Sequence, residues 1–382
     1  MMTVSSLVDA YLDVNILLAF ACLLWGLARL GLRSAGLGHA YTAQLKTVRA
    51  VFWAIILAPF AVALLSAMAL HGDVGRANPV NLSDFIIAQY LQGRFEMHPE
   101  SLEAMLGVRR HLVAGHIAGS YDAVFWLATG MIAGVAFFTA RLILSIFKLR
   151  QIIDESFVWR RIRGLELRLS DRTTVPFSTR GWRRRLIVFP STMLAEPEDL
   201  KIALGHELQH LRQRDVDWEI SLELLRPLFF WNPAFYLWKR QVEQLRELSC
   251  DRQVVMRKGY DVRTYCECLL RVCHSSLKKK RFFALNTPVV GLVQSENRLF
   301  GQSSAQVLRR RLMSLLDGKT EANSRILLAV LAAPLIGLTL LAAVAIQRPG
   351  DWSQDRLMLS TIVNLERLAT MNENSTLKQP SY

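Results

Sequence analysis

Long apolar stretches interrupt an otherwise polar chain of 382 residues. Residues 51–70 and 326–346 contain no charged side chain, and residues 123–147 contain a single one. Each stretch reaches the roughly 20 residues that a helix needs to cross the hydrocarbon core of a bilayer. A fourth stretch, 12–32, contains Arg29, which lies near one end and can extend its charge to the interface. The pattern predicts four transmembrane helices, at about 12–32, 51–70, 123–147 and 325–346.

A cleaved signal peptide is the alternative for the first stretch. Signal peptides begin with a positively charged segment. Residues 1–15 contain Asp9 and Asp13 but no lysine or arginine, so a retained span is favoured.

Composition excludes an ordinary soluble or disordered chain, because 52% of the residues are hydrophobic and only 20% are charged. Five cysteines do not suit a disulfide scaffold. The net charge of +14 is typical of a membrane protein with basic cytoplasmic parts or of a nucleic-acid binder. Segment 148–324 contains 32 basic and 20 acidic residues and so accounts for 12 of these charges. Membrane topology therefore explains the charge, and no direct nucleic-acid partner is expected.

Charge also orients the spans, since lysine and arginine are enriched in cytoplasmic loops. Loop 33–50 carries three basic residues and no acid, whereas loop 71–122 carries four basic and six acidic residues. The tail 347–382 carries four of each. We therefore expect a multi-pass protein of the cell inner membrane. Segment 148–324 lies in the cytoplasm, and both termini and loop 71–122 are extracytoplasmic.

Shorter periodicities within 148–324 predict a mixed α+β domain. Residues 148–164 are expected to continue the third span as a helix. Three strand-like runs with turn signals between them follow, at Leu165–Ser170, Thr173–Phe177 and Leu186–Phe189. From Pro197 to about Arg214 the pattern becomes helical, with two acids in the first turn.

Two histidines on this last helix, His206 and His210, stand one turn apart and flank Glu207 in the pattern HExxH. At this spacing both imidazoles can point at one metal ion. The glutamate lies beside that face and can take a proton from a water molecule that the metal activates. Apolar neighbours indicate a buried helix, and buried polar groups of this kind need partners. The pattern favours a catalytic zinc site over two solvated histidines on a surface helix.

A catalytic zinc site needs a third protein ligand. Seven acids downstream of the helix are candidates: Asp215, Asp217, Glu219, Glu223, Glu243, Glu247 and Asp251. Glu247 and Asp251 stand one helical turn apart, so one can bind the metal while the other orients a ligand histidine from behind. Glu243 competes with Glu247, which spacing alone favours only modestly. The alternative for both glutamates is a solvated helix face paired with Arg240 and Arg246.

Six motifs follow one another in a characteristic order: Pro176-Phe177-Ser178, the strand 186–190, HELQH at 206–210, Arg214-Asp215, Trp231-Asn232-Pro233 and the run 246–251. Together with the four spans they resemble the BlaR/MecR-type membrane metallopeptidases, which are antibiotic-sensing signal transducers and their relatives. The resemblance implies a gluzincin-like zinc peptidase domain that faces the cytoplasm. It implies His206, His210 and Glu247 as zinc ligands and Glu207 as the general base, and it strengthens Glu247 over Glu243.

One departure from these relatives is large. The antibiotic sensors of the family carry a penicillin-binding domain after the fourth span, whereas 36 residues follow Ile346 here. A packed sensor domain does not fit in that length. We therefore expect no acylation by β-lactams.

Two further segments are expected to meet the substrate or the bilayer. The strand Leu186–Phe189 precedes the zinc helix, and in gluzincin-like folds an edge strand there binds the substrate as an added strand. Plain sheet packing is an equal alternative. The apolar segment Ile220–Trp238 contains charges and prolines, so an amphipathic helix pair against the bilayer or under the site is favoured over a fifth span.

Basic and cysteine-rich segments later in the chain have simple interpretations. The runs Lys278–Arg281 and Arg309–Arg311 are expected to face anionic lipid headgroups. Cys266, Cys268 and Cys273 are expected to be buried, reduced thiols rather than a second metal site with His274.

The sequence thus predicts an α-helical membrane protein with an inserted α+β metallopeptidase domain. The membrane region covers 1–147, the zinc domain 148–324, the fourth span 325–346 and a short tail 347–382. The expected function is that of a regulatory zinc endopeptidase, which cuts a cytoplasmic or membrane-proximal protein in response to an envelope signal. The substrate would be a transcriptional repressor or the chain itself.

Two alternatives remain open. One is a quality-control protease of the HtpX kind, which shares HExxH and a downstream Glu-x-x-x-Asp. The other is a non-catalytic receptor with a structural metal site, although such a site needs no base like Glu207. No residue is assigned to substrate binding, and the oligomeric state stays unassigned.

Overall fold

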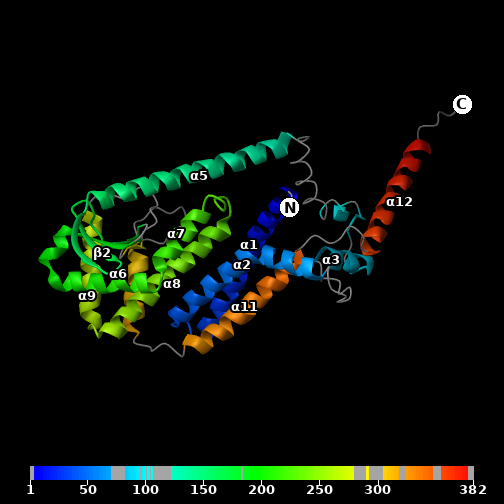
Figure 1. Ribbon diagram of the computed structural model, residues 1–382. Coiled ribbons are helices and arrows are strands. Elements are labelled where there is room, and N and C mark those ends of the chain that lie inside the picture. The colour runs from blue at the N-terminus through cyan, green and yellow to red at the C-terminus, as the bar shows by residue number, and fades with distance from the viewer. Residues whose placement is uncertain are drawn as a thin grey trace. The chain divides into compact units, whose positions relative to one another are not determined.

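The computed structural model describes residues 4–69, 82–94, 97–99, 101–103, 105, 122–181, 184–278, 290–291, 304–317, 324–346 and 354–376. These residues form a mostly helical protein with one mixed sheet (Figure 1). The chain divides into two compact units. The first comprises Met1–Ala21, Ala50–Met131 and Ala333–Tyr382, and the second comprises Cys22–Arg49 and Ile132–Ala332.

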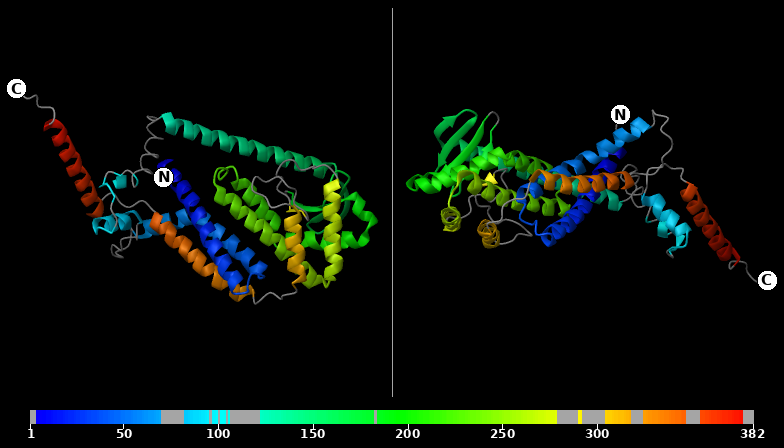
Figure 2. Two further views of the ribbon diagram at one scale, coloured as in Figure 1. Left: turned by 180° about the vertical axis from the view of Figure 1, so that it is seen from behind. Right: turned by 90° about the horizontal axis from the view of Figure 1, so that it is seen from below.

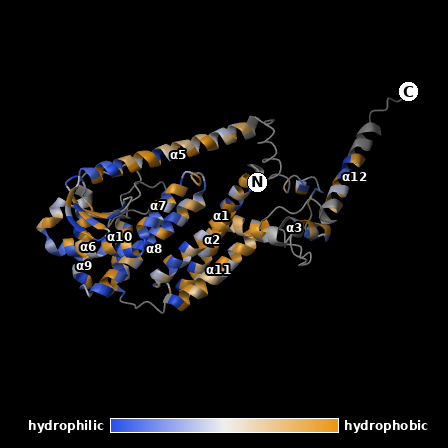
Figure 3. Ribbon diagram, viewed as in Figure 1, coloured by the Kyte–Doolittle hydropathy of each residue, from blue (hydrophilic) through white to orange (hydrophobic). Residues whose placement is uncertain are grey.

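Four helices are long and apolar enough to cross a membrane: α1 (Val4–Ser34), α2 (Tyr41–Ala69), α5 (Asp122–Asp154) and α11 (Ser324–Ile346). Figure 3 shows the apolar residues along them. The prediction of four spanning helices is confirmed at the level of length and composition. With 33 residues, α5 is about 50 Å long and exceeds the hydrocarbon core of about 30 Å. Its polar end therefore extends beyond the hydrocarbon core.

In the first unit, α3 (Leu82–Leu91) and α12 (Gln354–Thr376) pack together. Their contact buries Ile87 against Leu359 and Val363. An ion pair between His98 and Glu366, 3.1 Å long, lies in the same unit. Much of the predicted tail 347–382 is therefore a packed helix.

The second unit contains a sheet with the order β1-β2-β4-β3-β5. Its strands are β1 (Phe157–Ile162), β2 (Leu165–Ser170), β3 (Phe177–Arg180), β4 (Arg185–Pro190) and β5 (Val290–Gly291). Among the described strands, β2 and β4 pair in parallel and the other neighbours pair antiparallel. Side chains alternate across β4, so Ile187 and Phe189 face α6 while Val188 faces Leu149 and Ile152 of α5. The sheet is thus covered on both faces.

Three details of the strand prediction are wrong. The predicted helix at 148–164 ends at Asp154, and 157–162 is strand, because its β-branched and aromatic residues pair with β2 across a turn at Gly164 (φ +71°). The strand predicted at Thr173–Phe177 begins only at Phe177, after a turn. The strand at 186–189 is not an edge, since β4 pairs with β2 on one side and with β3 on the other.

Helices complete the second unit (Figure 2): a 3₁₀ turn η1 (Ser191–Ala195), α6 (Pro197–Arg212), α7 (Asp215–Leu225), α8 (Pro233–Lys258), α9 (Val262–Lys278) and α10 (Ser304–Leu316). A core among α6, α8, α9 and α10 contains Ile202, Val254, Leu269 and Leu315. The segment Ile220–Trp238 is indeed split between two helices. The second of these, α8, begins where the Asn232 side chain accepts a hydrogen bond from the Ala234 amide at 2.9 Å.

A left-handed residue links α6 to α7. Arg214 has φ 56° and ψ 33° and is the non-glycine residue with positive φ among those described. This conformation turns the chain back, so that Asp215 at the start of α7 faces His210 of α6.

We expect Arg214→Val to lower the free energy of unfolding by about 1–2 kcal/mol, because a β-branched residue is disfavoured in the left-handed region. Arg214→Gly should keep or raise the stability, since glycine adopts this conformation freely. Thermal melting in detergent measures both, with Arg212→Val as the control at the last helical position of α6. Equal losses in Arg214→Gly and Arg214→Val would contradict this explanation.

Candidate metal centre

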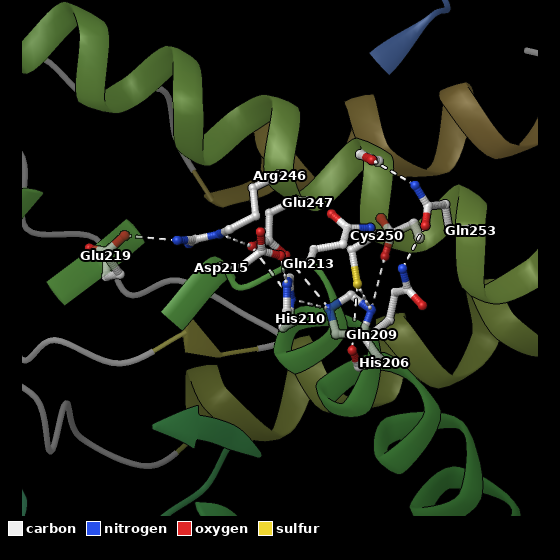
Figure 4. Close-up of polar contacts among 12 residues, drawn as sticks. His206, Gln209, His210, Gln213, Asp215, Glu219, Arg246, Glu247, Cys250 and Gln253 are labelled. Atoms are coloured by element: carbon white, nitrogen blue, oxygen red, sulfur yellow. Dashed lines mark hydrogen bonds and ion pairs between the residues drawn. The ribbon is translucent and has the colours of Figure 1, made fainter. Parts of the chain in front are cut away.

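The two histidines of HExxH meet inside the second unit. His206 and His210 are fully buried, and their Nε2 atoms lie 3.0 Å apart (Figure 4). Two nitrogen ligands of a tetrahedral zinc ion lie about 3.4 Å apart, since each Zn–N bond is about 2.1 Å long. The inner nitrogens are therefore placed as a divalent ion requires.

The outer nitrogen of His210 has a carboxylate partner. Its Nδ1 donates to Asp215 Oδ2 at 2.7 Å, and Asp215 in turn pairs with the Arg49 guanidinium of α2. Burial alone would raise the pKa of Asp215, but His210 and Arg49 hold it below its usual value. Such a carboxylate fixes the histidine tautomer and leaves the Nε2 lone pair directed inward.

The outer nitrogen of His206 is fixed by a second chain of contacts. The Tyr265 hydroxyl of α9 lies 2.8 Å from His206 Nδ1 and donates to Asp251 Oδ1 at 2.8 Å. Its oxygen is therefore the acceptor for the Nδ1 proton. Asp251 also accepts two hydrogen bonds from Arg311 of α10, at 2.7 and 2.6 Å. Asp251 thus lies behind a histidine, as predicted, with Tyr265 and Arg311 as neighbours that the sequence did not reveal.

Glu247 of α8 lies on the inner side of both histidines. Its carboxylate oxygens are 3.7 Å from His206 Nε2 and 3.9 Å from His210 Nε2. Arg246 lies 3.3 Å and Arg311 3.4 Å from the same carboxylate. Burial would raise the pKa of Glu247, but these neighbours hold it well below its usual value.

Glu243, the competing acid, lies elsewhere. It is buried, and the Lys239 ammonium lies 3.8 Å from its carboxylate. The alternative of a solvated face for Glu243 and Glu247 is wrong, because both carboxylates are buried in the unit. The structure brings Glu247, and not Glu243, to the histidine pair.

Cys250 is a further candidate ligand that the sequence analysis did not consider. His206, His210 and Cys250 form a group whose possible ligand atoms all lie within 4.8 Å of one another. The sulfur lies 3.6 Å from His206 Nδ1 and donates to the His206 carbonyl oxygen at 3.5 Å. It is therefore on the outer side of the ring, where Tyr265 and Asp251 also lie. Burial raises the pKa of this thiol well above its usual value.

Glu207 lies beside the histidines without a counter-charge of its own. It is fully buried, and within the described residues neither carboxylate oxygen has a hydrogen-bond partner. Burial raises the pKa of Glu207 to about 7, against the opposing influence of His210 and of the Ser178 hydroxyl. Burial and His210 lower the pKa of His206 to about 4. Burial would also lower the pKa of His210, but the Asp215 hydrogen bond and Glu247 raise it overall.

A buried ion-pair cluster adjoins the histidine site through Arg246. Arg246 donates to Glu219 at 2.8 Å, and Lys239 donates to Glu219 at 2.8 Å and also to Glu223. The i, i+4 spacing of Glu219 and Glu223 on α7 was visible in the sequence, yet spacing does not show that two buried cations lie opposite.

Two other sequence predictions have clear outcomes. Arg311 does not face lipid headgroups, because its side chain is buried and paired with Asp251. Cys268 and Cys273 are buried free thiols, as expected, and Cys268 belongs to the core among α6, α8, α9 and α10. The run Lys278–Arg281 lies largely outside the described residues.

The chain was compared with known proteins. The sequence model of the BlaR1 peptidase M56 family matches residues 41–299, about two thirds of the chain. No curated protein matches it. The match includes α6, α7 and α8 with all the histidines and carboxylates of the site, and it confirms the resemblance to the BlaR/MecR type. The chain is therefore a membrane protein that belongs to the BlaR1 peptidase M56 family of metallopeptidases.

Proposed function

We propose that the protein is a zinc-dependent endopeptidase with Glu207 as its general base. One observation carries the proposal: the buried Glu207 carboxylate, for which the described part of the chain supplies no recorded hydrogen bond, adjoins two buried histidines whose inner nitrogens converge. An orphaned buried carboxylate is costly. Its place is explained if it acts on a water molecule beside a metal ion. Family membership supports the same chemistry.

The residues of the site fit a zinc ion held by His206, His210 and Glu247. Their facing atoms lie 3.0 to 3.9 Å apart, and Glu247 Oε2 accepts no hydrogen bond within the described residues. A zinc ion there would act as a Lewis acid on a water molecule and on the substrate carbonyl. Glu207 would take the proton of that water and pass it to the leaving amine. Asp215, Tyr265 and Asp251 would hold the imidazoles in place.

The substrate would lie along β3. Ser178 of this strand is close enough to Glu207 to influence its pKa. In the structure, Val290 and Gly291 pair with Ser178 and Phe177 of β3, so a piece of the chain itself occupies this position. That pairing supports the chain as one of its own substrates, beside a cytoplasmic or membrane-proximal protein such as a transcriptional repressor.

The proposed setting is the inner membrane, with the site in the cytoplasm and both termini outside. The basic excess of segment 148–324 supports this orientation. Membership of the BlaR1 family favours a regulatory protease that answers an envelope signal over quality control of the HtpX kind. The presence of Glu207 disfavours a receptor with a structural metal site, because a structural site does not require a general base.

We expect Glu207→Gln to bind one zinc ion per chain, like the wild type, and to lose about 10²–10⁴-fold in cleavage rate, because general-base catalysis contributes a factor of that order. Elemental analysis gives the zinc content. Gel analysis after incubation with membranes and cytoplasmic extract gives the cleavage of the chain and of other proteins. Cleavage by Glu207→Gln at the wild-type rate would exclude this role.

The third ligand is tested by three matched substitutions on α8. Glu247→Gln should lose most of the bound zinc, whereas Glu243→Gln and Cys250→Ser should keep it, because only Glu247 faces both inner nitrogens. Zinc content per folded chain is the measurement, with circular dichroism as the control for folding. Loss of zinc in Cys250→Ser with retention in Glu247→Gln would transfer the ligand role to the cysteine.

Asp215→Asn should weaken zinc binding by about 10–100-fold, the usual loss when the carboxylate behind a ligand histidine is removed. Asp217→Asn is the control, since Asp217 lies two residues on and pairs with Arg180 at the surface. Competition with a chelator measures both affinities. Equal affinities in the two variants would show that Asp215 does not position His210.

A further inference from the structure

The helices α7 and α8 run as a hairpin (Figure 1), and its tip, residues 226–232, contains Leu228, Phe229, Phe230 and Trp231. Large apolar side chains around this tip are exposed: Leu224, Leu228, Trp231 and Leu237. At the opposite end of the same hairpin lie the charged residues of the metal centre. The exposed side chains of the tip therefore favour an apolar environment, whereas the other end of the hairpin is charged.

Contacts with α5 indicate how deep the tip of the hairpin lies along the apolar stretch of that helix. The Phe230 ring stacks on Phe138 of α5 with centroids 5.3 Å apart, and a Cβ at Gly134 would come within 2.2 Å of Phe230. Phe138 lies ten residues before Lys148, where the apolar stretch ends. At 1.5 Å per residue, the tip lies about 15 Å inside the boundary of the span, near the middle of the hydrocarbon core.

Contacts with α1 give the same depth independently. The Cys22 thiol donates to the Ala234 carbonyl of α8 at 3.3 Å, and Arg29 donates to Gln241 at 2.6 Å. Seven residues separate the two partners on each helix, and the numbers rise together, so α1 and α8 run parallel in this register. Cys22 lies eleven residues before Arg33, which places the start of α8 about 16 Å inside the span.

Several polar groups near the tip of the hairpin have partners within the protein, which lowers the cost of burying them in a membrane. Arg226 lies 3.3 Å from Glu223 and over the rings of Phe138 and Tyr236. The Tyr236 hydroxyl donates to the Phe230 carbonyl at 3.0 Å. These contacts lower the cost of removing the Arg226 charge and the loop carbonyl from water.

We propose that the α7–α8 tip is a re-entrant membrane hairpin, inserted beside α1 and α5 into the leaflet on the side of the metal centre, with lipid acyl chains as the partner of its exposed apolar residues. The insertion does not depend on catalysis. It places the metal centre at the membrane surface, because Asp215 pairs with Arg49, which lies two residues before the apolar stretch 51–70.

Spin labels test the depth in the full-length protein, reconstituted in vesicles of phosphatidylethanolamine and phosphatidylglycerol. A label attached through an introduced ketone amino acid leaves the native cysteines unchanged. Positions Leu224 and Leu228 report on the tip, and exposed Met256 and Leu194 of the same unit are the controls. At the tip, dissolved oxygen should relax the label several-fold more than a water-soluble nickel complex does, and the order should reverse at the controls.

Labels at 224 and 228 that the nickel complex reaches as readily as those at 256 would overturn the proposal. Labels that neither reagent reaches would also overturn it, since protein would then cover the tip. A second pair of variants tests the contact from which the depth follows. Gly134→Leu should lower the melting temperature and shift the label at 228 towards water. Gly130→Leu on the same helix, with nothing within 4 Å of its Cβ, should do neither. Identical behaviour of the two variants would contradict insertion beside α5.

Discussion

The balance of buried charge constrains the whole second unit. Seven carboxylates are buried at the histidine pair and in the adjoining ion-pair cluster: Glu207, Asp215, Glu219, Glu223, Glu243, Glu247 and Asp251. Five cationic side chains face them within the described residues: Arg49, Arg226, Lys239, Arg246 and Arg311. Uncompensated charge in such a place costs several kcal/mol per ion. A divalent ion between the histidines would reduce this excess of negative charge.

This constraint explains why the site draws on distant parts of the chain. HExxH and the Glu247 helix supply acceptors, but Arg49 comes from α2 and Arg311 from α10. Each arginine neutralises the carboxylate behind one histidine, so the two imidazoles are held by different elements. A displacement of α2 or α10 would release a buried carboxylate and loosen one histidine. The geometry of the centre is therefore a property of the unit, and not of α6 alone.

The sequence predicted those features that rest on a short period or a long apolar run. Four spans followed from length, and the meeting of His206, His210 and Glu247 followed from the i, i+4 rule and the family motifs. Contacts between distant segments were beyond this reasoning. Arg311 belongs to a basic run that is typical of a solvated surface. Nothing in its local sequence indicates that it pairs with Asp251, which lies 60 residues away in the chain. The strand at 157–162 was missed because its arginines continued the polar end of α5, while Gly164 turned the chain back.

The same charge balance bears on the membrane position of the unit. Desolvation of Glu219, Glu223 and Lys239 between α7 and α8 is costly in any environment. Once these groups are paired, however, the outer surface of the hairpin is apolar, and exposing it to water would add a further cost. An apolar environment around the tip would remove that further cost. The buried ion pairs remove charge from the surface of the hairpin, and the exposed leucines around the tip make that surface apolar. Both features suit an apolar environment. Together they would let the proposed re-entrant hairpin hold a charged metal centre at the surface of a bilayer.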